Sequence, residues 1–164
     1  MNAKTEQKER SHERILESAS RLLRERGIAG AGVAEVMKGA SLTVGGFYAH
    51  FPSKEALINE ALGRTAAATR ERLFARIGDK PEAARAEVIL KRYLSPAHRD
   101  DTERGCSLPA VVGEVGTTAG AHFDTLAAQI DALASGIEEL LPTAIEKAEA
   151  EIARLRAELA GRER

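Results

Sequence analysis

The chain has 164 residues and a formal net charge of −1, with 43% hydrophobic residues, only 4% aromatic residues and no Trp. This length allows one compact domain, or a small module attached to a larger one, with a core built mainly from Ala, Leu, Ile and Val. The apolar runs are far shorter than the roughly 20 residues that a bilayer crossing needs, and the polar start MNAKTEQKER lacks the apolar centre of a secretory signal. We therefore expect a soluble, cytoplasmic protein that does not engage a membrane.

The charge is divided unevenly along the chain. Residues 1–80 contain 14 Lys and Arg against 10 Asp and Glu, whereas residues 81–164 contain 10 against 15. The amino-terminal half, which carries a positive net charge, is therefore the candidate for binding a polyanion, and the acidic carboxy-terminal half is not. Cys106 is the single cysteine, which excludes an internal disulfide and a multi-cysteine metal site within one chain.

Apolar periodicity predicts two helices at the start of the chain. The first carries apolar residues at helical spacing, with Ser11 as a candidate N-cap and Gly27 as a stop. These apolar residues are Ile15, Leu16, Ala19, Leu22 and Leu23. A second, short helix is predicted in VAEVMKGA, residues 33–40, with Gly32 at its N-cap position, where glycine is tolerated.

The stretch TVGGFYAHF, residues 43–51, combines two adjacent glycines with three aromatic side chains and a histidine. On a helix of about 100° per residue, Phe47 and Phe51 point to one side and pack inward. The opposite, outward arc consists of Val44, Gly45, Tyr48 and Ala49, with Gly46 at its edge. Glycine on an exposed arc lets the backbone approach another surface closely. In the alternative interpretation the stretch is a Gly-rich connector whose Phe residues fill the core.

The remaining pattern is also helical. Pro52 ends the third helix at Phe51, and Ser53 caps a long fourth helix that runs until Gly78 to Pro81. Further helices are predicted at about 82–94, 108–118, 121–141 and 143–161. They are separated by the linker SPAHRDDTERG and by the Leu141-Pro142 joint. Because no period-two segment is long enough to be a strand, we predict an all-α fold.

The tight turn GASL before residues 43–51 completes an order of elements that is typical of a helix-turn-helix. From Arg14 to Ile58, and above all in ASLTVGGFYAHFPSKEALI, the sequence resembles the TetR family of bacterial transcriptional regulators. The resemblance implies a three-helix DNA-binding domain over residues 1–55, followed by a helical domain over residues 56–164 for effector binding and dimerisation.

The resemblance also implies which side chains meet DNA. It places Thr43, Val44, Gly45 and Tyr48 against base edges or sugar, and Gly46, His50 and Lys54 against the phosphate backbone. One departure concerns Gly32 and Val33, where the family usually has Ser or Thr, so a hydroxyl contact to phosphate is lost. A basic arm could replace it, or could be a frayed, solvated terminus; it would consist of Lys4, Lys8, Arg10 and Arg14.

Members of the family bind DNA as homodimers and release it when a small molecule enters the second domain. The resemblance therefore implies three partners: a double-stranded operator, a second copy of the chain and a small-molecule effector. Candidate pocket residues are Leu90, Tyr93, Leu94, Cys106, Val112, Val115 and Phe123, with plain core packing as the alternative for each. Cys106 precedes a predicted helix, a setting that can lower a thiol pKa and make a sensor; the alternative is a buried core residue.

The end of the chain is the least family-like part. Ile145, Ala148, Ile152, Leu155 and Leu159 form just over two heptads flanked by charged residues. They predict either a contribution to the dimer interface, within residues 121–159, or a single amphipathic helix lying on its own domain. The alternative function is a helical scaffold that acts through these carboxy-terminal helices.

No catalytic constellation is visible in the sequence. The four histidines, at positions 12, 50, 98 and 122, lack metal-ligand spacing on one helix, and neither a GxxxxGK loop nor a Gly-x-Ser-x-Gly elbow occurs. We therefore expect no enzyme activity, no cofactor and no metal site, and we predict a DNA-binding regulator of the repressor type.

Overall fold

The computed structural model describes residues 3–101, 104–117 and 119–162, with side chains as far as residue 155. Its α-helices are α1 (Ala3–Gly30), α2 (Val33–Gly39), α3 (Lys54–Phe74), α4 (Glu82–Tyr93), α5 (Pro96–Asp100), α6 (Leu108–Thr117), α7 (Phe123–Glu138) and α8 (Leu141–Arg162). Three short 3₁₀ helices are η1 (Val44–Ala49), η2 (Ile77–Asp79) and η3 (Gly120–His122). The described residues contain no strand, so the all-α prediction is confirmed.

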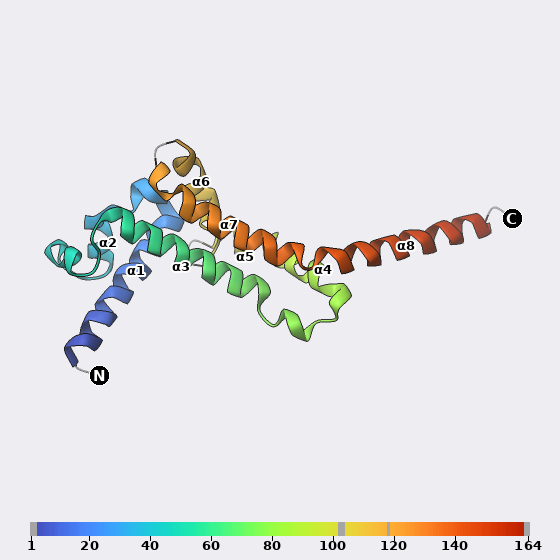
Figure 1. The fold of residues 1–164 in the computed structure, drawn as a ribbon, viewed down its shortest axis with the longest axis horizontal. Coiled ribbons are helices and arrows are strands. Elements are labelled where there is room, and N and C mark those ends of the chain that lie inside the picture. The colour runs from blue at the N-terminus through green and yellow to red at the C-terminus, as the bar shows by residue number, and fades with distance from the viewer. Residues whose placement is uncertain (1–2, 102–103, 118, 163–164) are drawn as a thin grey trace.

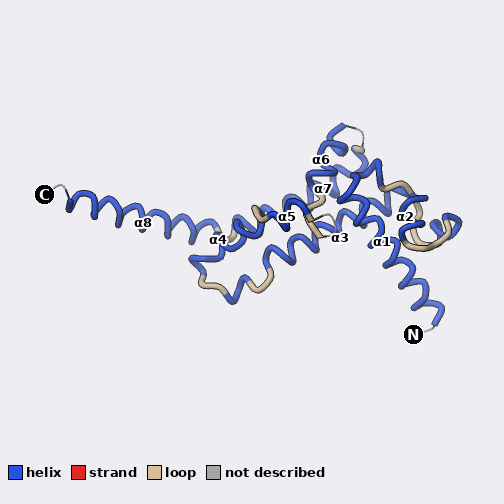
Figure 2. Tube along the Cα trace, turned by 180° about the vertical axis from the view of Figure 1, so that it is seen from behind, coloured by secondary structure: helices blue, strands red, loops and turns tan. Residues whose placement is uncertain are grey.

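The helices are arranged along one long axis (Figure 1). The helices α1 and α2 gather with η1 at one end, and α3 leads from this end toward α4 with α7 alongside it. The last helix, α8, contacts α4 and α7 near its start and then projects away from the body (Figure 2). Among the described residues, no helix combines the length and apolarity that a membrane crossing requires.

The first helix begins at Ala3, well before the predicted cap. Ser11 is buried inside α1, so the N-cap predicted there is wrong; the segment AKTEQKER before it is helical because most of its residues are good helix formers. Gly27 does interrupt the helical path, with φ 69° and ψ −167°. Because L side chains rarely adopt this conformation, the kink depends on glycine.

One hydrophobic core joins the first helices to the second part of the chain. The five apolar residues predicted for the inner face of α1 are all buried, as are Val36 and Met37 of α2. The same core contains Val111 and Val115 of α6 and Leu126 of α7. The amino-terminal helices therefore pack directly on α6, and the two parts of the chain are not separated by a linker.

The long helix α3 ends at Phe74, earlier than predicted, and Arg76 follows in the left-handed region with φ 53°. The guanidinium of Arg92, on α4, donates hydrogen bonds to the carbonyl oxygens of Leu73 (2.6 Å) and Ala75 (2.9 Å). These contacts satisfy carbonyls that a helix end leaves without partners, and they join α3 to α4. Gly78, the predicted breaker, lies in η2 instead.

Two other predictions need correction in the second half. The linker SPAHRDDTERG contains the short helix α5, whose N-cap Ser95 accepts a hydrogen bond from the backbone N–H of His98 at 3.2 Å. The break between the last two helices falls after Glu138, and Leu141 already begins α8. Pro142 therefore lies in the first turn, where its missing N–H costs the helix nothing.

Candidate nucleic-acid interface

The turn between α2 and η1 is built around Ser41, which has a φ of 54°. The N–H of Leu42 bonds to the carbonyl of Met37 and the N–H of Ser41 to that of Lys38, both at 2.9 Å. This pair of bonds closes α2 in the manner of a Schellman motif, with Ser41 in the position where glycine is usual. The turn sends the chain directly into η1.

The segment predicted as the third helix is wound as a 3₁₀ helix, η1, rather than as an α-helix. Its inner side agrees with the prediction, because Phe47 and Phe51 are 1% and 2% exposed and their ring centroids lie 5.8 Å apart. Thr43 occupies the N-cap position, although its side chain makes no capping hydrogen bond there. Because two glycines weaken this short element, packing of the two rings in the core is what holds it in place.

The outer side of η1 faces solvent. Tyr48 is 77% exposed and Val44 is 53% exposed, and Thr43 and Gly45 are exposed beside them. The ring of Tyr48 packs edge-on against Phe47 with centroids 5.2 Å apart, which restricts the directions in which its hydroxyl can point. The 3₁₀ winding of three residues per turn places Gly45 and Tyr48 one above the other.

The glycines of η1 are not needed by the protein interior. A Cβ added to Gly45 would meet no described atom within 4 Å, and at Gly46 it would lie 3.9 Å from Thr43 Oγ1, an ordinary contact. Neither residue has the positive φ that favours glycine. Glycine costs a helix roughly 0.5–1 kcal/mol relative to alanine, and neither the packing nor the backbone angles of the described residues account for that cost at these two positions.

The helix α3 begins directly behind η1. Ser53 is its N-cap, as predicted, and the Ser53 hydroxyl accepts a hydrogen bond from the N–H of Ala56 at 3.1 Å. Lys54 is half-buried, and its ammonium donates to the carbonyl of Ile28 at 3.4 Å. One donor of Lys54 is thus directed to the chain itself, which leaves two for an external acceptor.

The imidazole of His50, half-buried at the end of η1, has an Nδ1 with no hydrogen-bond partner among the described residues. Burial, followed by the charges of His12 and Lys8, lowers the pKa of His50 below its ordinary value. The ring of His12 stacks on Phe51 with centroids 4.5 Å apart and lies 6.1 Å from His50. His12, which the sequence analysis did not single out for this site, therefore braces the back of η1 from α1.

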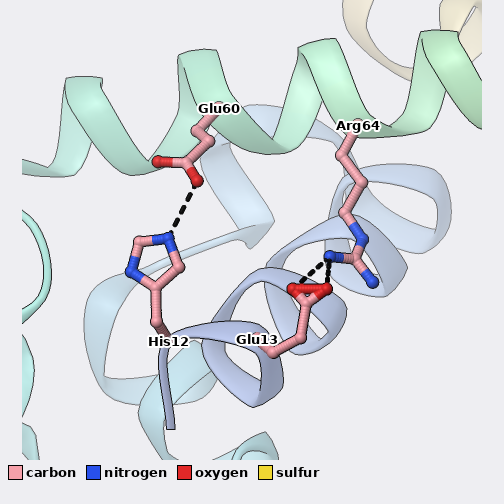
Figure 3. Close-up of polar contacts among 4 residues, drawn as sticks. All are labelled: His12, Glu13, Glu60 and Arg64. Carbon is pink, nitrogen blue, oxygen red and sulfur yellow. Dashed lines mark hydrogen bonds and ion pairs between the residues drawn. The ribbon is translucent and has the colours of Figure 1, made fainter. Parts of the chain in front are cut away.

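Two polar pairs connect α1 to α3 (Figure 3). The Nε2 of His12 lies 2.8 Å from a carboxylate oxygen of Glu60, and Glu13 pairs with the guanidinium of Arg64 one turn further along. Each pair is exposed, so each contributes about 0–1 kcal/mol. They add polar links between α1 and α3, which already pack on each other through the hydrophobic core.

The predicted basic arm is helical rather than frayed. Lys4, Lys8, Arg10 and Arg14 all lie on the exposed surface of α1. The amino-terminal turns of α1 extend beyond the body on the side of α2 and η1 (Figure 1).

A contact that the sequence analysis missed joins α6 to the kink in α1. The carboxylate of Glu114 accepts hydrogen bonds from the backbone N–H groups of Ile28 (3.0 Å) and Ala29 (2.8 Å). A Cβ at Gly27 would come within 1.9 Å of Glu114 Oε1. The glycine therefore allows α6 to approach. Glu114 accepts a hydrogen bond from the N–H of Ile28, and Lys54 donates one to the carbonyl of the same residue, so both side chains bind this segment.

The seven candidate effector residues do not line one cavity. Leu90, Leu94, Val112 and Phe123 are exposed on three different helices, Tyr93 is at the surface of α4, and Val115 is buried in the core. Cys106 does line a cavity of about 130 Å³ between α3, α7 and the start of α6, together with Leu62, Leu126 and Leu133. Burial raises the pKa of the Cys106 thiol, with a backbone hydrogen bond and Arg72 acting in the opposite direction. This setting opposes thiolate formation.

The described residues contain no cluster of three His, Cys, Asp or Glu side chains that could hold a metal ion. What the structure presents instead is a helix-turn-helix with an exposed, glycine-bearing third element, followed by a helical domain. This combination defines the class of helix-turn-helix DNA-binding proteins.

A sequence comparison relates part of the chain to a known family. Residues 15–61 match the profile of a family described as bacterial regulatory proteins, tetR family. This match covers the helix-turn-helix and the start of α3, and it supports the assignment of the chain as a DNA-binding transcriptional regulator. A comparison with curated protein sequences gave no match.

Two solved structures share the fold over most of the chain. A transcriptional regulator, TetR family, from Agrobacterium tumefaciens superposes with a TM-score of 0.72 at 15% identity, over 86% of this chain and 74% of that one. The fatty acid degradation regulator FadR from Bacillus halodurans superposes with a TM-score of 0.60 at 14% identity, over 84% of this chain and 70% of that one. At these identities the likeness establishes the fold.

Proposed function

We propose that this protein represses transcription by binding an inverted-repeat operator as a homodimer, and that a small-molecule effector releases it. The observation that carries the proposal is the outer face of η1. It combines an exposed Tyr48, packed edge-on against Phe47, with a glycine, Gly45, that no described neighbour requires. A backbone left bare in this way suits close approach to the floor of a DNA groove.

The residues of this face divide by chemistry. Thr43, Val44, Gly45 and Tyr48 are exposed on η1 and would reach base edges or sugar. Gly46, His50 and Lys54 lie behind them and would meet phosphate oxygens, to which an ammonium or an imidazole N–H can donate. Val44 and Tyr48 are the only sizeable side chains on this face, so one half-site discriminates weakly between base sequences. Two half-sites, bound by a dimer, are needed for useful sequence specificity.

The second part of the chain supplies surface for such a dimer. Ile130 on α7 and Leu141, Ile145, Ile152 and Leu155 on α8 are all exposed apolar residues. Leu159 of the predicted heptads lies outside the described side chains. A DNA-binding part over residues 1–55 and an effector and dimerisation part over residues 56–164 would meet at the start of α3. Repression of a bacterial operator places the protein in the cytoplasm and gives it no catalytic role.

One observation favours the alternative of a helical scaffold. The helix α8 projects from the body with its apolar positions uncovered (Figure 1), as expected of a helix that binds another protein. In this alternative α8 is the functional element and the outer face of η1 has no partner.

Selection from random duplex DNA, followed by fluorescence anisotropy at several salt concentrations, tests the proposal. We expect an enriched inverted repeat, with half-sites about one helical turn or a multiple of it apart, bound by a dimer whose affinity falls steeply with salt. A chain that forms dimers but enriches no sequence would overturn the proposed repressor and favour the scaffold.

A further inference from the structure

A second concave surface lies between α3, α4 and α5. It shares Thr69 with the apolar cavity, and none of the seven candidate residues is part of its lining, although the ring of Tyr93 packs against His98 at its edge. It is an open groove of about 580 Å³. Its polar and charged lining is provided by Arg72, Lys91, Arg92, His98, Asp101 and Arg104, with Thr69 and Ser95. Among the described residues that line it, four are Lys or Arg and one is acidic. Three of these four cations, Lys91, Arg92 and Arg104, come from the half of the chain that is acidic as a whole, and Arg72 comes from the basic half.

Three of the four cations are already engaged. Arg92 donates to the last carbonyls of α3, Lys91 pairs with Glu87 at 2.7 Å, and the Nε of Arg104 lies 3.6 Å from Asp101. Arg72 differs. Within the described part of the chain it makes one long hydrogen bond, 3.3 Å to the neutral hydroxyl of Thr69, and no ion pair. Its guanidinium is exposed at the wall of the groove with most of its donors available.

The charge of Arg72 acts on its neighbours. The pKa of Arg24, on α1, is lowered by burial and then by Arg72, although Asp101 and Glu25 oppose the shift. The pKa of His98 is likewise lowered by burial and then by Arg72. In both groups burial is the larger cause, and the positive charge of Arg72 adds to it, because a cation disfavours a second cation beside it. A bound anion would relieve this repulsion.

We propose that this groove is the effector site and that the effector is a small organic oxyanion, carrying a carboxylate or a phosphate. Arg72 would hold the oxyanion, and Arg104 would join it by exchanging its 3.6 Å contact with Asp101 for the ligand, since a planar guanidinium matches both groups with two parallel hydrogen bonds. Leu73 and Ala97, also in the lining, provide apolar contacts for the rest of a small ligand.

The position of the groove connects it to the DNA-binding part. Arg72 lies on α3, the helix that begins behind η1, and Arg24 lies on α1, which braces η1 through His12. An anion would attract both guanidiniums and so bias the relative position of α1 and α3. This regulatory consequence rests on the proposed repressor function, whereas binding of the anion does not.

The test is isothermal titration calorimetry on the full chain at constant ionic strength, without DNA. The probes are citrate for carboxylates, inorganic phosphate for phosphate groups, and glycerol as a neutral control. The variants are Arg72→Gln and Arg104→Gln, and the matched control is Arg154→Gln on the exposed part of α8. Thermal unfolding of each variant verifies that it folds. Anisotropy with the selected operator, with and without the tighter probe, then measures release.

We expect saturable binding of citrate or phosphate, weakened about tenfold or more by either groove variant, as loss of a charge-assisted pair predicts, and unchanged in Arg154→Gln. The stronger of the two probes identifies the oxyanion. No saturable binding of either probe, or equal weakening in the control, would overturn the site. Binding that leaves operator affinity unchanged would overturn its role as the effector site. If the chain enriches no operator but citrate still binds through Arg72, the repressor function fails and the anion site stands.

Discussion

The carboxylate of Glu114 accepts a hydrogen bond from the backbone N–H of Ile28 at 3.0 Å, across 86 residues of sequence. Glu114 belongs to α6 and Ile28 to the segment after the kink of α1, so this bond joins the second part of the chain to the part that carries η1. The carbonyl of the same residue, Ile28, accepts a hydrogen bond from the ammonium of Lys54 at the start of α3. Lys54 is a predicted phosphate contact, so a movement of α6 is transmitted to it through the backbone of Ile28.

Removal of this carboxylate should destabilise the fold. In Glu114→Ala the N–H groups of Ile28 and Ala29 lose their acceptor, and we expect the free energy of unfolding to fall by about 1–3 kcal/mol. Urea unfolding followed by circular dichroism measures the change. The control is Glu149→Ala, on the exposed surface of α8, which should stay within about 0.5 kcal/mol of the parent. Equal stability of the two variants would mean that the bond contributes nothing.

The kink itself should tolerate no side chain. In Gly27→Ala the new Cβ would lie 1.9 Å from Glu114 Oε1 and 2.7 Å from the carbonyl oxygen of Ala110, at a φ of +69°. We expect a loss of about 2 kcal/mol or more, from strain and from displacement of α6. The matched substitution Gly113→Ala, inside α6 with no described atom within 4 Å of the new Cβ, should stabilise by about 0.5–1 kcal/mol. A stable Gly27→Ala protein would contradict the close approach of α6.

Substitution of Gly45 should lower the affinity for DNA without lowering the free energy of unfolding. Gly45→Ala adds a methyl group that meets no described atom within 4 Å, so the free energy of unfolding should stay equal or rise by a few tenths of a kcal/mol. Operator affinity should nevertheless fall about tenfold, because the methyl group would hold the backbone away from the duplex. Gly120→Ala, in the 3₁₀ helix η3 and equally uncrowded, is the control and should leave operator affinity unchanged. If both variants bind the selected operator like the parent, the outer face of η1 does not approach DNA.

Tyr48 should carry a large share of the base or sugar contacts. Tyr48→Ala removes a ring that is 77% exposed, so far-ultraviolet circular dichroism should remain unchanged. Loss of one such contact in each half-site costs about 1–3 kcal/mol, and we expect at least a tenfold loss of operator affinity in anisotropy titrations. Tyr93→Ala, on the partly exposed surface of α4, should bind as the parent does. Normal binding by Tyr48→Ala would refute the assignment of the groove-facing side.

Acid should weaken the fold through its histidines. Burial is the largest cause that lowers the pKa of His50 and of His122, whose Nδ1 lies 2.6 Å from Asn59 Oδ1. Because the folded pKa values lie below the unfolded value of about 6.5, the unfolded chain binds more protons in this range. The stability that these groups contribute is therefore present above about pH 6.5 and is lost as the pH falls through the folded values.

We expect the free energy of unfolding, measured in urea, to decrease between about pH 7.5 and about pH 5.5, above the range in which carboxylates titrate. In His122→Asn the decrease should be smaller than in the parent. Proton NMR of the ring hydrogens should give midpoints for His50 and His122 below 6.5, the ordinary value. Stability that rises on acidification would show that the rings are charged in the folded state.

Local patterns in the sequence were enough to predict most of the helices and the helix-turn-helix order. Side chains at helical spacing, such as those of α1 and the pair Phe47 and Phe51, must turn to one side whatever surrounds them. Pro52 stops a helix for covalent reasons, and the hydroxyl of Ser53 reaches an amide three residues away. Each of these effects acts within about one helical turn, so the sequence by itself determines them.

Other features depend on residues far apart in the chain. Phe47 and Phe51 hold η1 against a core that α1 and α2 share. The bond from Glu114 to Ile28 needs α6 to lie beside the kink at Gly27, and the cationic groove forms only where α3, α4 and α5 meet. The exposure of Leu94 and the burial of Val115 were likewise decided by which helix packs on which. The sequence determined most of the helices and the family pattern of residues 15–61, because these follow from short-range spacing. The tertiary structure alone decided the interdomain contacts and the groove, because burial and charge clustering arise only when distant segments are brought together.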